Sequence, residues 1–175
     1  HHGGPEMNLG ESDILLLEGI HGLNPRLPFD QDDGVFRIFI NPLTSLQLDN
    51  ASRVSASDIR LLRRIVRDRH TRAITAASNI MRWPSVRRGE IKHIFPYQSL
   101  ADAVFNTALD YEIAVMKPIL EPVLKAVPYL GGRESAEIRR LLAVLETVLP
   151  ITDHSAIPGD SILRESIGGS VFEYV

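Results

Sequence analysis

Short apolar runs alternate along the chain with longer amphipathic segments. Residues 13–19 (DILLLEG) form one unbroken apolar run that an acid and a glycine close, which is typical of a strand buried on both faces of a parallel sheet. Two further runs, 35–40 (VFRIFI) and 102–106 (DAVFN), also have the character of strands, and Pro42 stops the first of them. The pattern predicts an α/β fold in which a parallel sheet is flanked by helices.

The segment from about Asp58 into the seventies has the periodicity of an amphipathic helix. Ser55 or Ser57 can cap this helix, and it contains no internal proline or glycine. At about 100° per residue, its apolar residues fall on one side and four arginines share a narrow arc opposite. The apolar residues are Leu61, Leu62, Ile65 and Val66, and the arginines are Arg60, Arg63, Arg64 and Arg67. We therefore predict one buried face and one unusually cationic face.

The segments between this helix and residue 130 are less regular. Residues 83–90 (WPSVRRGE) contain the proline and glycine that are typical of a loop. The apolar segment 109–116 fits a strand as well as a helix, so both assignments remain open. Pro118 suits the first turn of a helix that continues to about residue 127.

The residue pattern in the last part of the chain predicts mainly helix. The glycine pair at 131–132 breaks the chain, and an amphipathic helix is expected over 135–149, followed by one or two helical turns over 161–167. We therefore expect two parts: residues 1–130 with the parallel sheet and the cationic helix, and a helical C-terminal extension over residues 131–175.

The composition is that of a soluble globular protein. The 175 residues are 44% hydrophobic and 23% charged, and no apolar run approaches the roughly 20 residues that span a bilayer. The chain has no cysteine, which fits a cytoplasmic location, and we expect no membrane partner. Its net charge of −3 conceals a basic segment, because residues 53–92 hold 11 of the 19 lysines and arginines. An anionic partner is therefore expected at this segment.

The four arginines of the predicted helix point to a bound anion. Guanidinium groups at positions i, i+3, i+4 and i+7 repel one another, and this helix offers only Asp58 and Asp68 to offset them. Phosphate is the natural ligand, because a guanidinium group presents paired donors and always stays charged. The arginines alone do not distinguish a nucleotide from a nucleic-acid backbone.

Glu18 is the candidate metal ligand. In open α/β sheets, ligands bind beyond the carboxyl ends of the strands, and Glu18 closes the predicted strand at 13–19. A carboxylate there can hold magnesium directly or through water. Many buried strands also end in an acid for solubility or capping alone, so this pattern leaves both roles open.

Five sequence blocks stand out as a set: DILLLEGIHGLNP at 13–25, LRRIVRD at 62–68 with Arg72, MRWPSVRRGE at 81–90, IFPY at 94–97 and SILRE at 161–165. The most specific part is WPSVRRGE. Together these blocks resemble a bacterial branch of the uridine kinase and phosphoribulokinase family. In that branch the kinase domain is the C-terminal part of a longer chain, which commonly begins with domains similar to those appended to threonyl-tRNA synthetase.

The resemblance implies a P-loop kinase fold that transfers phosphate from ATP, with magnesium, to uridine or a related small-molecule hydroxyl. It places Glu18 at the second acidic (Walker B-like) position, as a magnesium ligand. The LRRIVRD helix is then the lid, with Arg64 and Arg67 as catalytic residues that reach the acceptor and the transferred phosphate. Arg72 would bind the nucleotide phosphates. The family often has glycine at the position of Ala73.

The remaining arginines are assigned to phosphate binding on two grounds. Arg60 and Arg63 belong to the same helical stripe as the catalytic pair, and we assign them to the cofactor phosphates. Arg87 and Arg88 lie in the block that is specific to this branch of the family, and they are further candidates.

The sequence contains no GxxxxGK[ST] motif, whose backbone amides and lysine cradle nucleotide phosphates. The segment in which this family places its general base and most of its nucleoside contacts is missing as well. We therefore expect a partial P-loop kinase fold that is inactive alone and acts with the missing N-terminal half of the kinase domain.

Two functions without catalysis are alternatives. The cationic segment could make the chain a polyanion-binding module, with RNA as its ligand, because tRNA-synthetase-like neighbours are expected in this branch. The chain could also be a structural half-domain that self-associates into a homo-oligomer to cover an exposed sheet edge.

Overall fold

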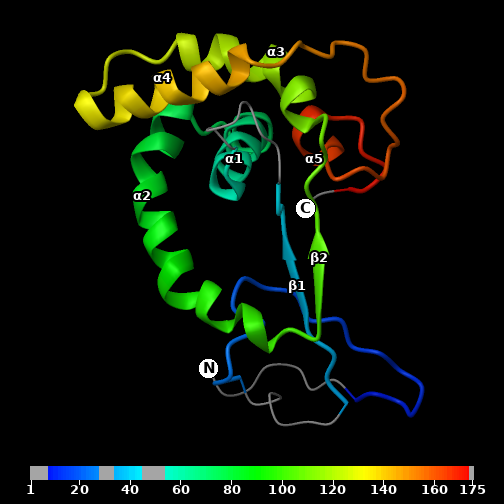
Figure 1. Cartoon of the computed structure of the whole chain (residues 1–175). Coiled ribbons are helices and arrows are strands. Elements are labelled where there is room, and N and C mark those ends of the chain that lie inside the picture. The colour runs from blue at the N-terminus through cyan, green and yellow to red at the C-terminus, as the bar shows by residue number, and fades with distance from the viewer. Residues whose placement is uncertain (1–7, 28–33, 45–53, 174–175) are drawn as a thin grey trace.

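A computed structural model of the chain describes residues 8–27, 34–44 and 54–173. Within these ranges the fold is mixed α/β and mainly helical (Figure 1). The elements in chain order are β1 (Ile38–Asn41), α1 (Ala56–Arg72), α2 (Ala76–His93), the 3₁₀ helix η1 (Phe95–Leu100), β2 (Ala103–Asn106), α3 (Glu112–Lys125), α4 (Gly132–Glu146) and α5 (Arg164–Ile167). None of the helices in the described ranges is both long and apolar enough to cross a membrane.

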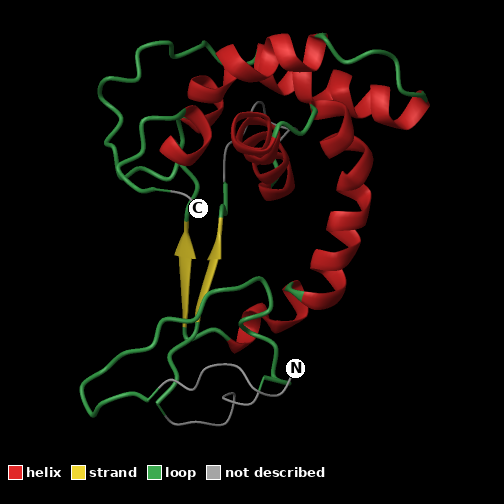
Figure 2. Cartoon of the chain, turned by 180° about the vertical axis from the view of Figure 1, so that it is seen from behind, coloured by secondary structure: helices red, strands yellow, loops and turns green. Residues whose placement is uncertain are grey.

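The two strands form a parallel pair, as the sequence predicts. Ile38 pairs with Ala103 and Asn41 with Asn106, so the strands run in register over four residues. Seen from behind in Figure 2, both strands run from the loops at one end of the molecule toward its helical part. The predicted strands at 35–40 and 102–106 and their parallel arrangement are therefore confirmed.

The strand predicted over residues 13–19 is wrong. This segment has no regular structure, and the side chains of Ile14 and Leu16 are 94% and 87% exposed. A strand buried in a parallel sheet needs partners on its edges and faces. Here β1 and β2 pair with each other and not with this segment, so the apolar run lacks the neighbours that would make it a strand.

The cationic helix is confirmed as α1. Ser55 caps it, and a capping box joins Ser55 to Asp58: the Asp58 N–H donates to the Ser55 hydroxyl, and the Ser55 N–H donates to the Asp58 carboxylate. The predicted apolar side chains are all buried, and Leu62 and Ile65 are at most 1% exposed. In Figure 1, α1 lies at the centre of the helical part, between α2, α3 and α5.

The loop predicted over residues 83–90 is also wrong, because α2 continues through this block to His93. The buried residues of α2 recur at helical spacing, and tertiary packing of that stripe outweighs the unfavourable Pro84 and Gly89. They are Ala76, Asn79, Ile80, Trp83 and Glu90.

The sequence left segment 109–116 undecided between strand and helix. In the structure α3 begins within this segment, at Glu112, six residues before the predicted start at Pro118. Pro118 lies inside this helix, where it cannot donate to the carbonyl of Ala114. The backbone N–H of Ile151 donates to that carbonyl instead, over 3.0 Å. This contact satisfies the backbone group that the proline leaves without a partner, so the helix continues past it.

The helices predicted after the glycine pair are confirmed as α4 and α5. Leu141 and Leu145 of α4 are fully buried in the same hydrophobic cluster as Ile65 of α1 and Leu120 of α3. The described residues on either side of position 130 thus share one core.

Candidate anion-binding site

The four stripe arginines of α1 line one pocket of about 200 Å³. The helix presents them opposite its buried apolar face, so the helical period that buries Ile65 also turns the guanidinium groups toward the pocket. The lining residues are Arg60, Arg63, Arg64 and Arg67 of α1, Trp83 and Val86 of α2, Ile162, Glu165 and Ser166 at α5, and Pro42 after β1.

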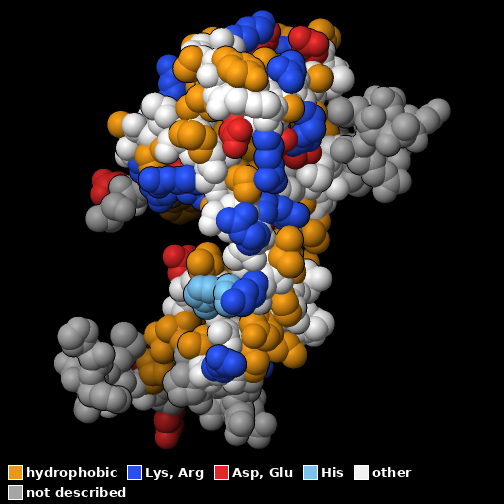
Figure 3. All heavy atoms as spheres, turned by 90° about the vertical axis from the view of Figure 1, so that its left-hand side faces the viewer, with side chains coloured by type: hydrophobic (Ala, Val, Ile, Leu, Met, Phe, Trp, Pro, Cys, Tyr) orange, Lys and Arg blue, Asp and Glu red, His pale blue; other side chains and the backbone are white. Residues whose placement is uncertain are grey.

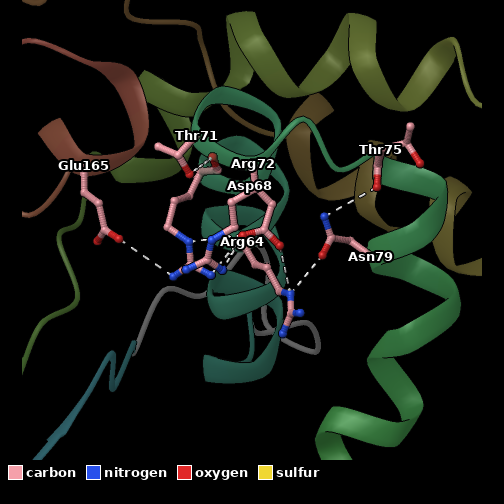
Figure 4. A network of polar contacts seen from close by, with 8 residues as sticks. Arg64, Asp68, Thr71, Arg72, Thr75, Asn79 and Glu165 are labelled. Atoms are coloured by element: carbon pink, nitrogen blue, oxygen red, sulfur yellow. Dashed lines mark hydrogen bonds and ion pairs between the residues drawn. The ribbon is translucent and has the colours of Figure 1, made fainter. Parts of the chain in front are cut away.

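Asp68, which is fully buried, gathers three arginines around its carboxylate (Figure 4). Its Oδ1 accepts hydrogen bonds from Arg67 Nη2 over 3.1 Å and from Arg72 Nη1 over 3.2 Å. Arg64 Nε lies 3.2 Å from the other carboxylate oxygen and donates to Asn79 Oδ1 over 2.8 Å. The Asn79 contact ties the arginines of α1 to α2.

Arg63 is fixed to the segment that leads into α3. Its Nε donates to Oε2 of the fully buried Glu112 over 2.5 Å, and its Nη2 donates to the backbone carbonyl of Thr107. The other Glu112 oxygen accepts from the Leu109 N–H over 3.1 Å. Both oxygens of this buried carboxylate therefore have partners.

Glu90 of α2 is the third buried carboxylate, and it lies between two arginines. It forms an ion pair with Arg60 of α1, and Arg87 Nη1 donates to its Oε2 over 3.1 Å. The Arg87 guanidinium also lies 5.7 Å from the centre of the Phe95 ring. Arg87 is thus held by Glu90 and Phe95 and does not line the pocket.

Arg67 has a second and looser partner. Its Nη1 lies 3.8 Å from Oε1 of Glu165, and both side chains are about one-third exposed. Figure 4 shows Glu165 pointing from α5 toward the guanidinium groups of α1. Among the described residues that line the pocket, Glu165 is the only acid.

The arginines of the site outnumber the carboxylates that pair with them. Six guanidinium groups contact four carboxylates, so the network as a whole keeps a positive excess, although Arg72 and Arg87 contribute to it from outside the pocket lining. The arginines are Arg60, Arg63, Arg64, Arg67, Arg72 and Arg87, and the acids are Asp68, Glu90, Glu112 and Glu165. This excess favours an anion, although it is smaller than the sequence of α1 alone suggests.

Two of the predicted phosphate ligands lie outside the pocket lining on the open surface. Arg72 ends α1 with a side chain that is 55% exposed. Arg88 is exposed on α2 and forms no ion pair within the described ranges. Figure 3, which shows the side of the molecule formed by α2, has basic side chains along this face. The structure thus places Arg60, Arg63, Arg64 and Arg67 in the pocket lining. Arg72 joins Arg64 and Arg67 at Asp68 but does not line the pocket, and neither do Arg87 and Arg88.

Glu18 is not brought to the pocket either. It is exposed, and its segment (residues 8–27) lies at the end of the molecule away from α1 (Figure 1). Within the described ranges, no three acidic or histidine side chains are close enough together to hold a metal ion. The described side chains that line the pocket are thus mainly guanidinium donors with one carboxylate, and they include no group of metal ligands.

Trp83 is the one tryptophan of the chain and forms part of the pocket wall. It is 8% exposed, and its indole N–H donates to the Ser57 hydroxyl over 3.3 Å. The side chain therefore anchors α2 to the first turn of α1. Its position makes its fluorescence a natural reporter of ligands in the pocket.

Two of the three buried carboxylates of the site are not evident from the sequence. Glu90 and Glu112 lie 30 and 49 positions from their arginine partners, Arg60 and Arg63. The helical spacing of Ala76, Ile80, Trp83 and Glu90 was the available signal for Glu90.

Comparison with protein-family models, with curated proteins and with solved structures gave no match. What the pocket can bind is therefore inferred from its own side chains.

Proposed function

We propose that the pocket lined by the α1 arginines binds a phosphate group. The observation that carries this proposal is the convergence of four guanidinium groups on one pocket of about 200 Å³. Paired guanidinium N–H donors match phosphate oxygens and stay charged at every physiological pH. Drug-sized ligands occupy pockets of about 300–1,000 Å³. The smaller volume here suits a phosphate or diphosphate group, with the rest of a nucleotide outside it.

The buried carboxylates support this role because they hold the arginines in place. Asp68, Glu90 and Glu112 are each at most 2% exposed, and each pairs with at least one pocket arginine. Donors that are fixed before the ligand arrives lose little conformational entropy on binding, and they need not reorganise as charge develops on a transferred phosphate.

We further propose that the chain is part of an ATP-dependent kinase that phosphorylates uridine or a related small-molecule hydroxyl, as the resemblance of its motifs implies. Arg64 and Arg67 would then contact the acceptor and the transferred phosphate, and Arg72 the nucleotide phosphates. ATP would be the phosphate donor, and magnesium would neutralise part of its charge.

The exposed sheet supports a larger parent fold of the P-loop kinase kind. Parallel strands normally have both faces covered, yet the paired residues Ile40 and Phe105 are 63% and 60% exposed. We propose that the N-terminal half of the kinase domain, with its P-loop, covers this face with helices and adds strands to the edges of the sheet. Residues 1–175 alone are then expected to transfer no phosphate.

Phosphate binding can be tested by titrating the chain with inorganic pyrophosphate while Trp83 fluorescence is recorded. Arg67→Gln should weaken binding about tenfold, because it removes a charged hydrogen-bond donor. Arg69→Gln is the matched control: Arg69 lies on the same helix, is exposed and does not line the pocket. Equal effects of the two substitutions, or no binding by the unmodified chain, would contradict the proposal.

The kinase proposal requires the parent polypeptide, with ATP, magnesium and a panel of nucleosides and sugar phosphates. Transfer to at least one acceptor is expected, and Arg67→Ala should abolish it. If the parent transfers no phosphate, or if Arg67→Ala leaves transfer unchanged, the kinase proposal fails while phosphate binding by the pocket can still stand.

A further inference from the structure

Glu165 reaches into the pocket that we propose binds phosphate. We infer that its carboxylate is the exchangeable counter-ion of Arg67: an incoming phosphate displaces it, so Glu165 sets the affinity of the pocket for anions. This inference rests on the proposed phosphate-binding function and adds a competing group that belongs to the protein itself.

The ion pairs of the pocket differ in how easily they can be broken. Asp68, Glu90 and Glu112 are almost fully buried, so each needs its arginine partners to offset a charge held away from water, and losing them is strongly unfavourable. The Arg67–Glu165 pair spans 3.8 Å, and its side chains are 30% and 34% exposed. Exposed pairs of this kind contribute little stability, so Glu165 is the carboxylate that a ligand can replace.

The backbone that carries Glu165 is held firmly. The preceding residue, Arg164, donates to the backbone carbonyls of His154 over 2.8 Å and of Ile157 over 2.6 Å. Leu163 is 1% exposed and packs against Ile157 in a small hydrophobic cluster. The exchange therefore requires only a rotation of the Glu165 side chain toward solvent, with α5 in place.

The same carboxylate opposes the ligand in two ways. In the free protein it pairs with Arg67 and so competes with the ligand for this guanidinium group. After displacement it stays within the screening length of a bound phosphate, about 8 Å at physiological salt, and repels it. Both effects lower the affinity of the pocket for an anion. Neutralising Glu165 without changing its shape should therefore tighten binding.

The test is a pyrophosphate titration, followed by Trp83 fluorescence, of Glu165→Gln, Arg67→Gln and the double variant. Glu165→Gln should tighten binding about two- to fivefold, the range that an exposed ion pair supports. In the Arg67→Gln background the same change should have a clearly smaller effect, because the partner is gone. Glu121→Gln removes one negative charge from an exposed Lys125 pair on α3, outside the pocket lining, and serves as the charge-matched control.

The titration distinguishes a failure of the Glu165 inference from a failure of the phosphate-binding proposal. If the unmodified chain binds pyrophosphate and Glu165→Gln binds it no more tightly, or no more tightly than Glu121→Gln, the inference is overturned and the phosphate pocket stands. The inference would also be overturned if Glu165→Gln raised the affinity for pyrophosphate equally in the unmodified chain and in the Arg67→Gln variant. If neither the unmodified chain nor Glu165→Gln binds pyrophosphate, both are overturned.

Discussion

Arg63 and Glu112 are 49 positions apart in the chain and form an ion pair that joins the pocket to the start of α3. Glu112 is fully buried, so the pair anchors one wall of the pocket to the core. Glu112→Gln should lower the free energy of unfolding by about 2–4 kcal/mol, because it leaves the Arg63 guanidinium partly buried without its counter-ion. Urea denaturation measures this loss.

Glu121 provides the comparison for that substitution. Its pair with Lys125 lies on the exposed surface of α3. Glu121→Gln should therefore leave the denaturation midpoint unchanged within error. If the two glutamine variants were equally stable, Glu112 would not be an anchor of the site.

The ion pair between Asp58 and Arg140 should make the stability of the protein depend on pH. Burial alone would raise the pKa of Asp58, but the hydrogen bonds and charge of Arg140, together with Ser55, hold this pKa below its ordinary value. A carboxyl whose pKa is lowered by folding stabilises the protein above its unfolded-state pKa of about 3.9, and this stability is lost as the pH falls through the folded-state pKa. Arg140→Gln should thus cost about 1–2 kcal/mol at pH 7 and progressively less below pH 4.

Denaturation of Arg140→Gln and of the unmodified chain at pH 7 and at pH 3 checks this expectation. Arg139→Gln removes the same charge from the neighbouring exposed position on α4, which forms no ion pair within the described ranges. A loss that is the same at both pH values, or that Arg139→Gln reproduces, would contradict the assigned role of Asp58.

Ala73 ends α1 in a left-handed backbone conformation, with φ 53° and ψ 28°. This conformation is unfavourable for residues with a Cβ atom and is typical of glycine after a helix. Ala73→Gly should raise the free energy of unfolding by about 0.5–1 kcal/mol, because the relief of strain exceeds the added freedom of the unfolded chain. Thermal unfolding measures the gain.

Ala136→Gly is the control for Ala73→Gly. Ala136 lies exposed inside α4, where glycine is unfavourable, and the substitution should destabilise the chain by about 0.5–1 kcal/mol. If Ala73→Gly also destabilised the chain, the strain assigned to the end of α1 would be refuted.

Local patterns in the sequence predicted α1 and the two strands well, because each carries its own signal. The capping serine and the spacing of Leu61, Leu62 and Ile65 identify α1 without reference to the rest of the chain. The loop predicted around Pro84 shows the limit of local signals. There the packing of Trp83 and Glu90 against α1 decides the structure, and such long-range contacts are invisible in a short window of sequence.

The same limit applies to the site. The helical spacing correctly placed four arginines of α1 in one pocket, but it overestimated their free charge, because Glu90 and Glu112 come from other helices. Glu18 was assigned on the expectation of a buried strand, and that expectation fails in the described structure, where the segment is exposed. Local residue patterns thus located the cations and Asp68, but not Glu90 and Glu112, which hold Arg60 and Arg63.

The salt dependence of binding to single-stranded RNA distinguishes a phosphate pocket from a polyanion-binding surface. Because four carboxylates offset most of the arginine charge, the pocket should engage no more than about two backbone phosphates. The slope of log affinity against log salt concentration is then expected to be no steeper than about −1.4, at roughly −0.7 per phosphate. A slope steeper than about −3 would favour the RNA-binding alternative.

The most direct test of phosphate binding is the NMR signal of the arginine Nε–Hε groups during a titration with pyrophosphate. We expect the signals of Arg64 and Arg67 to shift in a saturable way, because their side chains line the pocket and remain partly exposed. The signals of Arg69 and Arg139 should not move. No saturable shift at Arg64 and Arg67, or equal shifts at all four arginines, would show that the pocket does not bind phosphate.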